Sequence, residues 1–293
     1  MSDASGLVVV DKPAGMTSHD VVARLRRILR TRRVGHAGTL DPMATGVLVC
    51  GVGRGTRLLG HLAQDSAPDA KAYAATIRLG ASTTTDDAEG ELLSTADPTG
   101  VTDEAVAAGI AELTGPIMQA PSAVSAIKVD GRRAYARVRA GEEVVLPARP
   151  VTVATFTLLA RQGPDLDVVV ECSSGTYVRA LARDLGAALA VGGHLTALRR
   201  TRVGPFDLRQ ARTLPELESE PGQSLTLAEA VAAAFPRRDV DDAAAIALAH
   251  GRPLPPAGVP GTYGVFAPDG RVLALVADRD GAARPLVVLA PAG

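Results

Sequence analysis

The stretch Arg33-Val34-Gly35-His36-Ala37-Gly38-Thr39-Leu40-Asp41-Pro42-Met43-Ala44-Thr45-Gly46 stands between a basic segment and an apolar run. It contains three glycines, one histidine and a single carboxylate, that of Asp41. Glycines allow left-handed backbone conformations and close approach of another chain segment. Pro42 disfavours the helical region for the residue before it, so we expect Asp41 to be extended. The stretch therefore predicts a loop whose carboxylate can point toward a ligand.

Upstream of this loop the pattern predicts a short strand and then a capped helix. Leu7 to Val10 form an apolar run, and Thr17 followed three positions later by Asp20 fits a capping box. The expected helix has an apolar face, which consists of Val21, Val22, Leu25, Ile28 and Leu29. Arginines occupy its other face and its exit, at Arg24, Arg26, Arg27, Arg30, Arg32 and Arg33. A solvated face is one interpretation, but the scarcity of acidic neighbours favours a phosphate-binding patch.

The length, net charge and composition of the chain limit the classes of protein to which it can belong. With 293 residues, the chain fits one large domain and a small one, and a net charge of -1 means that affinity for nucleic acid must come from local clusters. Aromatic residues make up only 3%, which argues against a surface built mainly from base-stacking rings. No apolar run approaches the roughly 18 residues of a membrane span, so a cytoplasmic protein is expected. Cys50 and Cys172 lack metal-ligand spacing and are expected as two buried thiols, with a disulfide as the alternative.

Two glycine-rich or acidic segments follow the loop, and neither has the spacing of a known ligand motif. After a buried strand at Val47–Cys50, the cluster Gly51–Thr56 resembles a phosphate cradle but fits a tight strand-to-helix turn better. The next expected strand is Lys71–Gly80. The loop around Asp86, Asp87 and Glu89 lacks the order of an EF-hand and is interpreted as solvated.

The following part of the chain is predicted to alternate helices and strands, with two further basic clusters. We expect helices at Thr102–Leu113 and Thr176–Ala190, and strands at Val151–Leu159 and Leu166–Cys172. Arg179 falls in the first turn of the second helix, where a cation opposes the helix dipole and needs a compensating anion. The basic clusters are Lys128, Arg132, Arg133, Arg137 and Arg139 around Tyr135, and later Arg199, Arg200 and Arg202.

From about Pro221 the pattern changes to that of a small appended domain. An alanine-rich helix at Leu225–Ala234 and a short helix ending at His250 precede three short strands near Tyr263, Val272 and Val287.

Four motifs occur in order over about residues 6 to 205. They are Asp11-Lys12-Pro13-Ala14-Gly15-Met16-Thr17-Ser18, Gly35 to Gly46 of the opening stretch, Lys71-Ala72-Tyr73 with Arg78-Leu79-Gly80, and Cys172-Ser173-Ser174-Gly175-Thr176-Tyr177-Val178-Arg179 with Asp184-Leu185-Gly186. One such motif would be weak, but the ordered set closely resembles the TruB family of tRNA pseudouridine synthases.

This resemblance implies a fold and a domain division. The expected fold is α+β, a pseudouridine synthase fold with a mixed, largely antiparallel sheet and flanking helices, followed by a small PUA-like RNA-binding domain. The catalytic domain would span residues 1–220, with an RNA-gripping insertion at about 117–149, and the C-terminal domain residues 221–293. Pro121 to Lys128 resembles the start of that insertion.

The resemblance also implies the reaction, which is isomerisation of uridine to pseudouridine at position 55 in the T-arm loop of tRNA. The family uses no metal and no organic cofactor. Asp41 would be the essential carboxylate, acting either as a nucleophile or as a general base at C2′ that leads to a glycal. Arg179 would be its ion-pair partner, and Tyr73 would stack on the uracil and assist proton transfer at C5.

Further residues would contact the substrate. The resemblance places Tyr177 and Leu198 in the wall around the base and His36 in the space left by the flipped nucleotide. Lys12 belongs to the same region and is expected to brace the loop rather than react, while Arg132 and Arg133 would contact phosphates. The implied partner is the tRNA T-arm stem-loop, bound by a monomer without a protein partner.

Three other interpretations stay open at this point. The chain could be an RNA-folding chaperone without chemistry, although Asp41, Tyr73 and Arg179 together speak against chaperoning as its sole role. It could be a small-ligand enzyme that uses Gly51–Gly55 for phosphate. It could also act on another RNA, as guide-dependent relatives do, but its length favours the stand-alone bacterial type.

Overall fold

The computed structural model describes residues 5–63, 70–124, 128–129, 132–133 and 146–290. The chain divides into two compact units. Unit 1 comprises Met1–Leu40, Val47–Ala63 and Pro205–Gly293, and unit 2 comprises Asp41–Gly46 and Gln64–Gly204. The six residues that begin with Asp41 therefore belong with unit 2, although the residues on both sides of them belong to unit 1.

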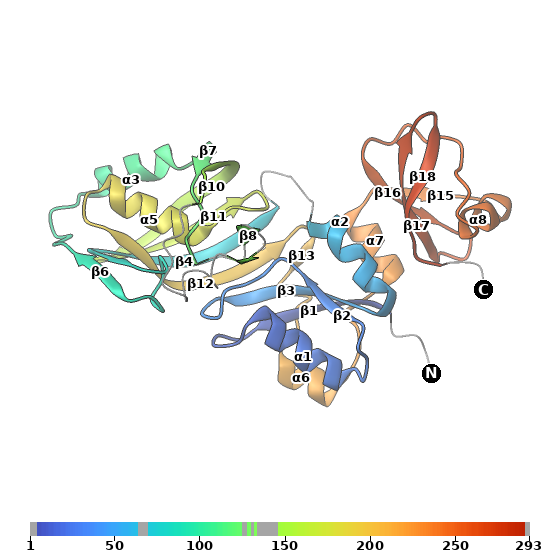
Figure 1. The fold of residues 1–293 in the computed structure, drawn as a ribbon, viewed down its shortest axis with the longest axis horizontal. Coiled ribbons are helices and arrows are strands. Elements are labelled where there is room, and N and C mark those ends of the chain that lie inside the picture. Colours follow the sequence, from blue (N-terminus) through green and yellow to red (C-terminus); the bar gives the residue numbers. More distant parts are fainter. Residues whose placement is uncertain (1–4, 64–69, 125–127, 130–131, 134–145, 291–293) are drawn as a thin grey trace. The chain divides into compact units, whose positions relative to one another are not determined.

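Unit 2 is built on an antiparallel sheet with two helices (Figure 1). The sheet strands are β4 (Lys71–Leu79), β7 (Gly115–Gln119), β10 (Arg149–Gln162), β11 (Asp165–Cys172) and β12 (Gly193–Val203), in the order β12-β4-β11-β10-β7. The start of β3 (Thr45–Val52) adds in parallel to β12, through Thr45 and Gly46. The expected mixed, largely antiparallel sheet is thus confirmed.

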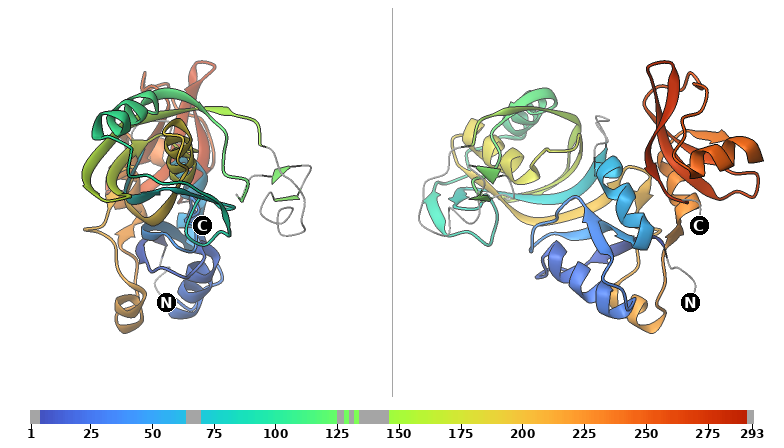
Figure 2. Two further views of the ribbon diagram at one scale, coloured as in Figure 1. Left: turned by 90° about the vertical axis from the view of Figure 1, so that its left-hand side faces the viewer. Right: turned by 45° about the vertical axis from the view of Figure 1, so that its right-hand side comes forward.

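Helices and two hairpins complete unit 2. Helices α3 (Asp103–Glu112) and α5 (Val178–Ala188) contact each other, and each contacts strands of the curved sheet (Figure 2). The hairpins are β5 (Ala81–Thr83) with β6 (Leu92–Thr95) and β8 (Lys128–Val129) with β9 (Arg132–Arg133). Alternation explains the sheet, because every second residue of β11 from Leu166 to Cys172 is buried. Of the predicted RNA-gripping insertion, residues 125–127, 130–131 and 134–145 lie outside the described part, including Tyr135, Arg137 and Arg139.

The N-terminal elements of unit 1 follow the predicted order with one exception. They are β1 (Gly6–Lys12), α1 (Ser18–Ile28), β2 (Val34–Ala37), the rest of β3, the 3-10 helix η1 (Gly53–Leu58) and α2 (Leu59–Ala63). Strand β2 lies inside the stretch predicted to be a loop, because its residues pair with the end of β3. The capping box of Thr17 and Asp20 is present, and it lowers the pKa of the Asp20 carboxyl because that group accepts hydrogen bonds from Thr17. The Gly51–Thr56 cluster is a strand-to-helix turn, as predicted, and a Cβ on Gly55 would lie 2.0 Å from the Gly6 carbonyl oxygen.

The C-terminal part of unit 1 contains a second sheet. Its elements are β13 (Phe206–Asp207), α6 (Leu214–Ser219), β14 (Leu225–Thr226), α7 (Leu227–Ala234), β15 (Arg237–Asp239), α8 (Asp242–Ala249), β16 (Thr262–Phe266), β17 (Val272–Arg279) and β18 (Ala282–Val288). Strand β14 pairs with β1, whereas β15-β16-β17-β18 form a separate sheet over their own apolar core. The three predicted strands are confirmed, and β15 was not predicted.

Both cysteines are buried free thiols, as expected. Burial raises the pKa of Cys172 to about 11, so this thiol is protonated at neutral pH. Within the described residues, no helix is long and apolar enough to cross a membrane.

Candidate active site

The loop that carries Asp41 is held by backbone contacts on both of its sides. The Ser18 hydroxyl accepts a hydrogen bond from the Leu40 N–H (2.9 Å) and lies 3.1 Å from the Leu40 carbonyl, to which it donates. At the other end, Gly46 has φ +98°, and a Cβ there would lie 2.2 Å from the Arg200 carbonyl oxygen. Only glycine meets both requirements without strain. The glycine and the serine therefore fix the path of the chain on either side of the carboxylate.

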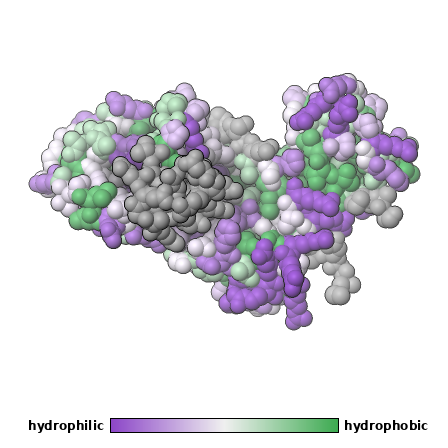
Figure 3. Space-filling view, viewed as in Figure 1, coloured by the Kyte–Doolittle hydropathy of each residue, from purple (hydrophilic) through white to green (hydrophobic). Residues whose placement is uncertain are grey.

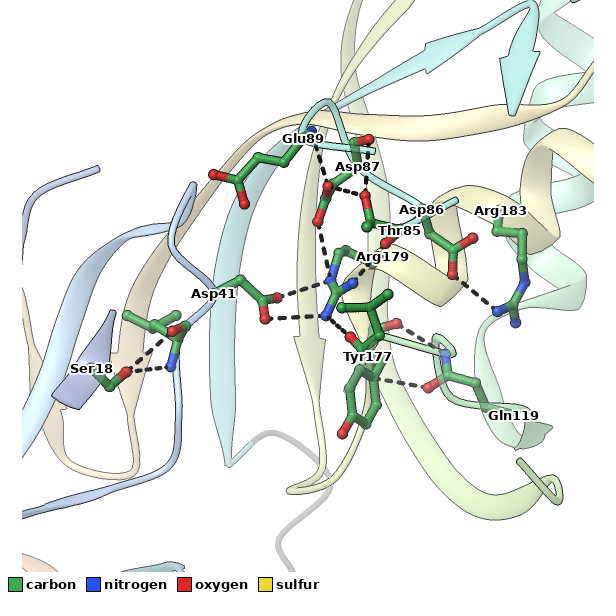
Figure 4. Close-up of polar contacts among 12 residues, drawn as sticks. Ser18, Asp41, Thr85, Asp86, Asp87, Glu89, Gln119, Tyr177, Arg179 and Arg183 are labelled. Atoms are coloured by element: carbon green, nitrogen blue, oxygen red, sulfur yellow. Dashed lines mark hydrogen bonds and ion pairs between the residues drawn. The ribbon is translucent and has the colours of Figure 1, made fainter. Parts of the chain in front are cut away.

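The Asp41 carboxylate forms a two-pronged ion pair with Arg179 (Figure 4). Arg179 Nε donates to Oδ2 at 2.9 Å, and Nη2 donates to Oδ1 at 3.1 Å. The Asp41 side chain is 33% exposed, whereas that of Arg179 is 4% exposed. A buried guanidinium thus holds a carboxylate that still has a face open to a ligand. The anion that the sequence required near Arg179 is Asp41, as predicted.

Arg179 has further acceptors that the sequence did not reveal. Asp87 Oδ2 lies 3.5 Å from Arg179 Nε, and the Thr85 and Val124 carbonyls accept from Nη1 and Nη2 at 2.6 and 2.9 Å. The Asp87 side chain is 4% exposed, and its Oδ1 also accepts hydrogen bonds from the Thr85 hydroxyl and the Glu89 N–H. Asp87 therefore helps to orient the arginine.

The interpretation of the 86–89 loop as solvated is wrong for its two aspartates. Asp86 pairs with Arg183 at 3.1 Å, and Asp87 is buried beside Arg179. Of the three acidic residues, only Glu89 is exposed, as expected of a solvated loop. A guanidinium has five N–H donors, more than Asp41 alone can satisfy, so a buried Arg179 needs further acceptors, but the sequence does not say which residues supply them.

Tyr73 lies on β4 and is buried. Burial raises the pKa of its hydroxyl to about 12, although the Arg200 guanidinium, which hydrogen-bonds it, acts in the opposite direction. The charge of Asp41 also raises this pKa, as a smaller cause than burial. At neutral pH, Tyr73 is therefore a neutral phenol.

Arg200 does not belong to a solvent-facing basic cluster, although it was grouped with Arg199 and Arg202. It is 1% exposed, and on β12 it stands opposite Gly46 on one side and Tyr73 on the other. Arg202 in turn pairs with Glu171 at 3.2 Å.

Two predicted wall residues belong to the same unit. Leu198 is buried on β12, and Tyr177 is half-buried immediately before α5. The Arg149 guanidinium lies 5.3 Å from the centre of the Tyr177 ring, a cation–π distance. Gln119 bonds the Tyr177 backbone, a contact that no sequence signal indicated.

Of the other predicted site residues, two belong to unit 1 and two have side chains outside the described part. Lys12 and His36 belong to unit 1. Lys12 is buried, and its Nζ donates to the Pro13 and Met16 carbonyls at 2.8 and 2.6 Å, so it braces the loop after β1. The His36 ring meets the His19 ring edge to face, with 5.4 Å between centroids. Arg132 and Arg133 form strand β9, and their side chains are outside the described part.

The arrangement suits chemistry at a sugar with one accessible carboxylate. Glycosidases place two carboxyl groups on opposite sides of the bond, one of them as a proton donor. Here the second carboxylate, Asp87, is buried beside Arg179 and also accepts hydrogen bonds from the Thr85 hydroxyl and the Glu89 N–H. The site therefore offers a nucleophile or base at Asp41, a buried cation at Arg179 and a neutral phenol at Tyr73.

The N-terminal domain of TruB family pseudouridylate synthases matches residues 26–178. The C-terminal domains described as tRNA pseudouridylate synthase B C-terminal domain and tRNA pseudouridine synthase II, C terminal, match residues 179–229 and 235–290. This chain belongs to the TruB family. Its curated relatives include "tRNA pseudouridine synthase B" from Nocardia farcinica, 62% identical over 98% of this chain and 94% of that protein. The protein of the same name from Thermobifida fusca is 60% identical over 98% and 99% of the two chains.

Solved structures agree with the family assignment. One match is a chain of the archaeal box H/ACA sRNP Nop10-Cbf5 complex. The superposition covers 99% of this chain and 87% of that chain, with a TM-score of 0.71 and 27% sequence identity. A Cbf5-Nop10-Gar1 complex gives a TM-score of 0.72 at 25% identity. As a TruB-family pseudouridine synthase, the protein is an isomerase that acts on uridine in tRNA, and a TruB C-terminal domain follows its catalytic fold.

Proposed function

We propose that this TruB-family enzyme isomerises the uridine at position 55 in the T-arm loop of tRNA, with Asp41 as its essential carboxylate. The observation that carries the proposal is the two-pronged pair between Asp41 and the buried Arg179, which leaves one third of the Asp41 side chain exposed. The pair orients the carboxylate toward a ligand before the ligand arrives, so little reorganisation is needed during reaction.

The chemistry exchanges one bond of the base for another. The bond from C1′ to N1 breaks, the uracil turns within the site, C5 bonds to C1′, and the proton that leaves C5 is balanced by one gained at N1. Asp41 attacks as a nucleophile or removes the C2′ proton to give a glycal, and both routes use the same exposed oxygens. Arg179 pairs with the Asp41 carboxylate and keeps its oxygens in place whenever that group is released.

We assign Tyr73 to contacts with the uracil rather than with the sugar. Its ring stacks on the uracil, and its hydroxyl, neutral because its pKa is about 12, takes part in transferring the C5 proton. Tyr177 and Leu198 form the wall that retains the freed base. A site that keeps the base enclosed favours rejoining over hydrolysis.

Recognition of the tRNA uses other parts of the chain. The target base is stacked in a folded loop, so it is flipped out at a cost of a few kcal/mol, which phosphate contacts offset. We assign these contacts to Arg132, Arg133 and the exposed arginines Arg27, Arg32 and Arg33, with His36 filling the vacated space. Hydrophilic side chains gather over α1 and α6 (Figure 3).

The proposed organisation keeps residues 1–220 as the catalytic domain, with the insertion at 117–149, and residues 221–293 as a PUA-like RNA-binding domain. The enzyme acts as a monomer in the cytoplasm, without a protein partner.

The test is release of tritium from a tRNA transcript labelled at uracil C5, with purified wild type and Asp41→Asn side by side. We expect release from wild type only, with the product mapped to position 55. Asparagine keeps the shape but not the charge, so a folded, inactive variant isolates the carboxylate. Tight binding without release from either protein would favour an RNA chaperone, and release from both would place the chemistry on another residue.

A further inference from the structure

The two ends of the predicted insertion meet directly beside the active site. Gln119 ends β7 and Arg149 begins β10, and these two residues stand opposite each other in the antiparallel register. The chain between them contains the segment assigned above to RNA contacts. Both residues also reach across to the turn at residues 175–177, which leads into α5 and Arg179.

Gln119 braces the start of helix α5 from another strand. Most helices in the chain begin at Thr or Asp, whose side chain accepts from the backbone, as Thr17 does for α1. At the start of α5 stands Tyr177, which makes no such bond within the described residues. The Gln119 amide does not accept from a first-turn N–H either, but from another strand it binds both backbone groups of Tyr177. Its Oε1 accepts from the Tyr177 N–H at 2.8 Å, and its Nε2 donates to the Tyr177 carbonyl at 3.1 Å.

The Gln119 amide therefore bonds Tyr177 as a neighbouring strand would, with one donor and one acceptor matched. Its side chain is buried (1% exposed), so both bonds are shielded from competing water. Figure 4 shows the amide beside Tyr177, on the side of the Arg179 guanidinium where Asp41 does not lie.

Arg149 fixes the same turn from the opposite strand. Its guanidinium donates to the Gly175 carbonyl and lies against the Tyr177 ring. The chain that leaves Gln119 then passes along α5, where the Ala120 carbonyl accepts from Arg183 at 2.8 Å and the Val124 carbonyl accepts from Arg179 at 2.9 Å. The segment 119–124 thus contacts Tyr177 through Gln119, Arg183 through the Ala120 carbonyl and Arg179 through the Val124 carbonyl.

We propose that Gln119 and Arg149 are positioning residues for the pseudouridine synthase reaction. They hold the backbone of residues 175–177, and through it the Tyr177 ring against the base and the Arg179 guanidinium against Asp41. The proposal rests on the function proposed above. Catalytic groups need to be held within about half an ångström, and a misplacement of about 1 Å can cost 100-fold in rate.

The experiment measures single-turnover pseudouridine formation at saturating enzyme, together with tRNA Kd and Tm. Gln119→Met keeps the volume but removes both bonds, Gln119→Glu keeps only the acceptor while ionised, and Arg149→Met removes the second clamp. Thr76→Val is the matched control. It removes a 2.7 Å hydrogen bond to Asp167 on the same sheet without touching residues 175–179.

We expect Gln119→Met to lower the single-turnover rate by about 10- to 100-fold with Kd within about twofold of wild type. Arg149→Met should lower it in the same direction, while Thr76→Val stays near the wild-type rate. Gln119→Glu should recover as pH falls from 8 to 6, because a protonated carboxyl regains the donor that Tyr177 needs. Loss of Tm alone, with the rate unchanged, would overturn the proposal.

The rate of Gln119→Glu measured from pH 8 to 6 keeps the proposal testable if Gln119→Met fails to fold. A Gln119→Glu rate that follows the wild-type pH profile, or a weakened Kd that accounts for the whole loss, would also overturn it. Failure of the proposed function is distinguishable, because wild type itself would then form no pseudouridine at position 55.

Discussion

A buried arginine such as Arg179 needs hydrogen-bond acceptors and a negative charge close to its guanidinium. Its guanidinium has five N–H donors, and the fold brings it two carboxylates and two carbonyls from segments as far as 138 positions away in the sequence. The need for an anion could be predicted from the place of Arg179 in the first turn of a helix. Asp41 could be predicted from its motif. Asp87 could not, because only the folded chain reveals that its loop turns inward.

Replacing Asp87 tests whether it orients Arg179. Asp87→Asn should lower the rate of pseudouridine formation by about 10- to 100-fold, since Arg179 then has one charged partner and more freedom to turn. The control is Asp86→Asn, which changes the neighbouring carboxylate that pairs with Arg183, at a φ of +61° that asparagine tolerates. Single-turnover assays of both variants provide the measurement. Equal rates in the two would contradict the orienting role.

Tyr73 gives a prediction at alkaline pH. The pKa of its hydroxyl is about 12 in the folded protein and about 10 in the unfolded chain. Between these values the unfolded state has lost the proton and the folded state keeps it, so folding stability falls as pH rises from 10 to 12. The loss approaches about 2 to 3 kcal/mol above pH 12. Tyr73→Phe has no hydroxyl to titrate, so its stability does not fall from this cause.

Urea unfolding of wild type and Tyr73→Phe at pH 9 and pH 11 measures the difference. Other groups titrate in both proteins, so only the change in the gap between them reports on Tyr73. From pH 9 to pH 11, the free energy of unfolding of wild type should fall by more than that of Tyr73→Phe. A constant gap would mean that the phenol is not held in a dry environment.

At the scale of elements, prediction succeeded where local chemistry decides the structure. The capping box before α1, the turn after β3 and the alternation in β11 each depend on residues close in sequence, and all three are present. Prediction failed where a distant partner decides. Strand β15 reads Arg-Arg-Asp and has no apolar alternation, yet it pairs in parallel with β16. Likewise, the start of α5 is braced by Gln119, 58 positions away from Tyr177.

The start of α1 offers a test that separates helix capping from support of the catalytic loop. Thr17 and Ser18 are neighbours, but Thr17 caps the helix whereas Ser18 bonds both backbone groups of Leu40. Ser18→Ala should cost about 1 to 3 kcal/mol of stability, because it leaves two buried backbone groups without their partner, and it should also lower the rate. Thr17→Ala should lower Tm with little change in rate.

Chemical denaturation and single-turnover rates of the two variants, measured well below their Tm, decide between these roles. If Thr17→Ala slowed the reaction as much as Ser18→Ala, the loop would depend on the helix as a whole rather than on the serine.

At the scale of the whole molecule, the net charge does not show which arginines are paired with carboxylates and which can bind RNA. A net charge of -1 gives no general attraction to RNA. Many arginines are engaged locally, including Arg24 with Glu218, Arg78 with Asp165 and Arg161 with Asp103. The basic helix α1 therefore has fewer available cations than its sequence indicated, since Arg26 also donates to the Val34 carbonyl. Binding of tRNA should then depend on a small number of arginines.

Charge reversal tests that dependence at Arg132 and Arg133. Each phosphate contact releases counterions, so log Kd changes with log salt by up to about 0.9 per contact. Arg132→Glu/Arg133→Glu should weaken tRNA binding and reduce this slope by about 1 to 2. The control, Arg78→Glu/Arg161→Glu, lowers the net charge equally but at arginines already paired with aspartates. Binding titrations from 50 to 200 mM salt measure both. If both variants lost affinity equally and kept the wild-type slope, overall charge rather than the insertion would govern binding.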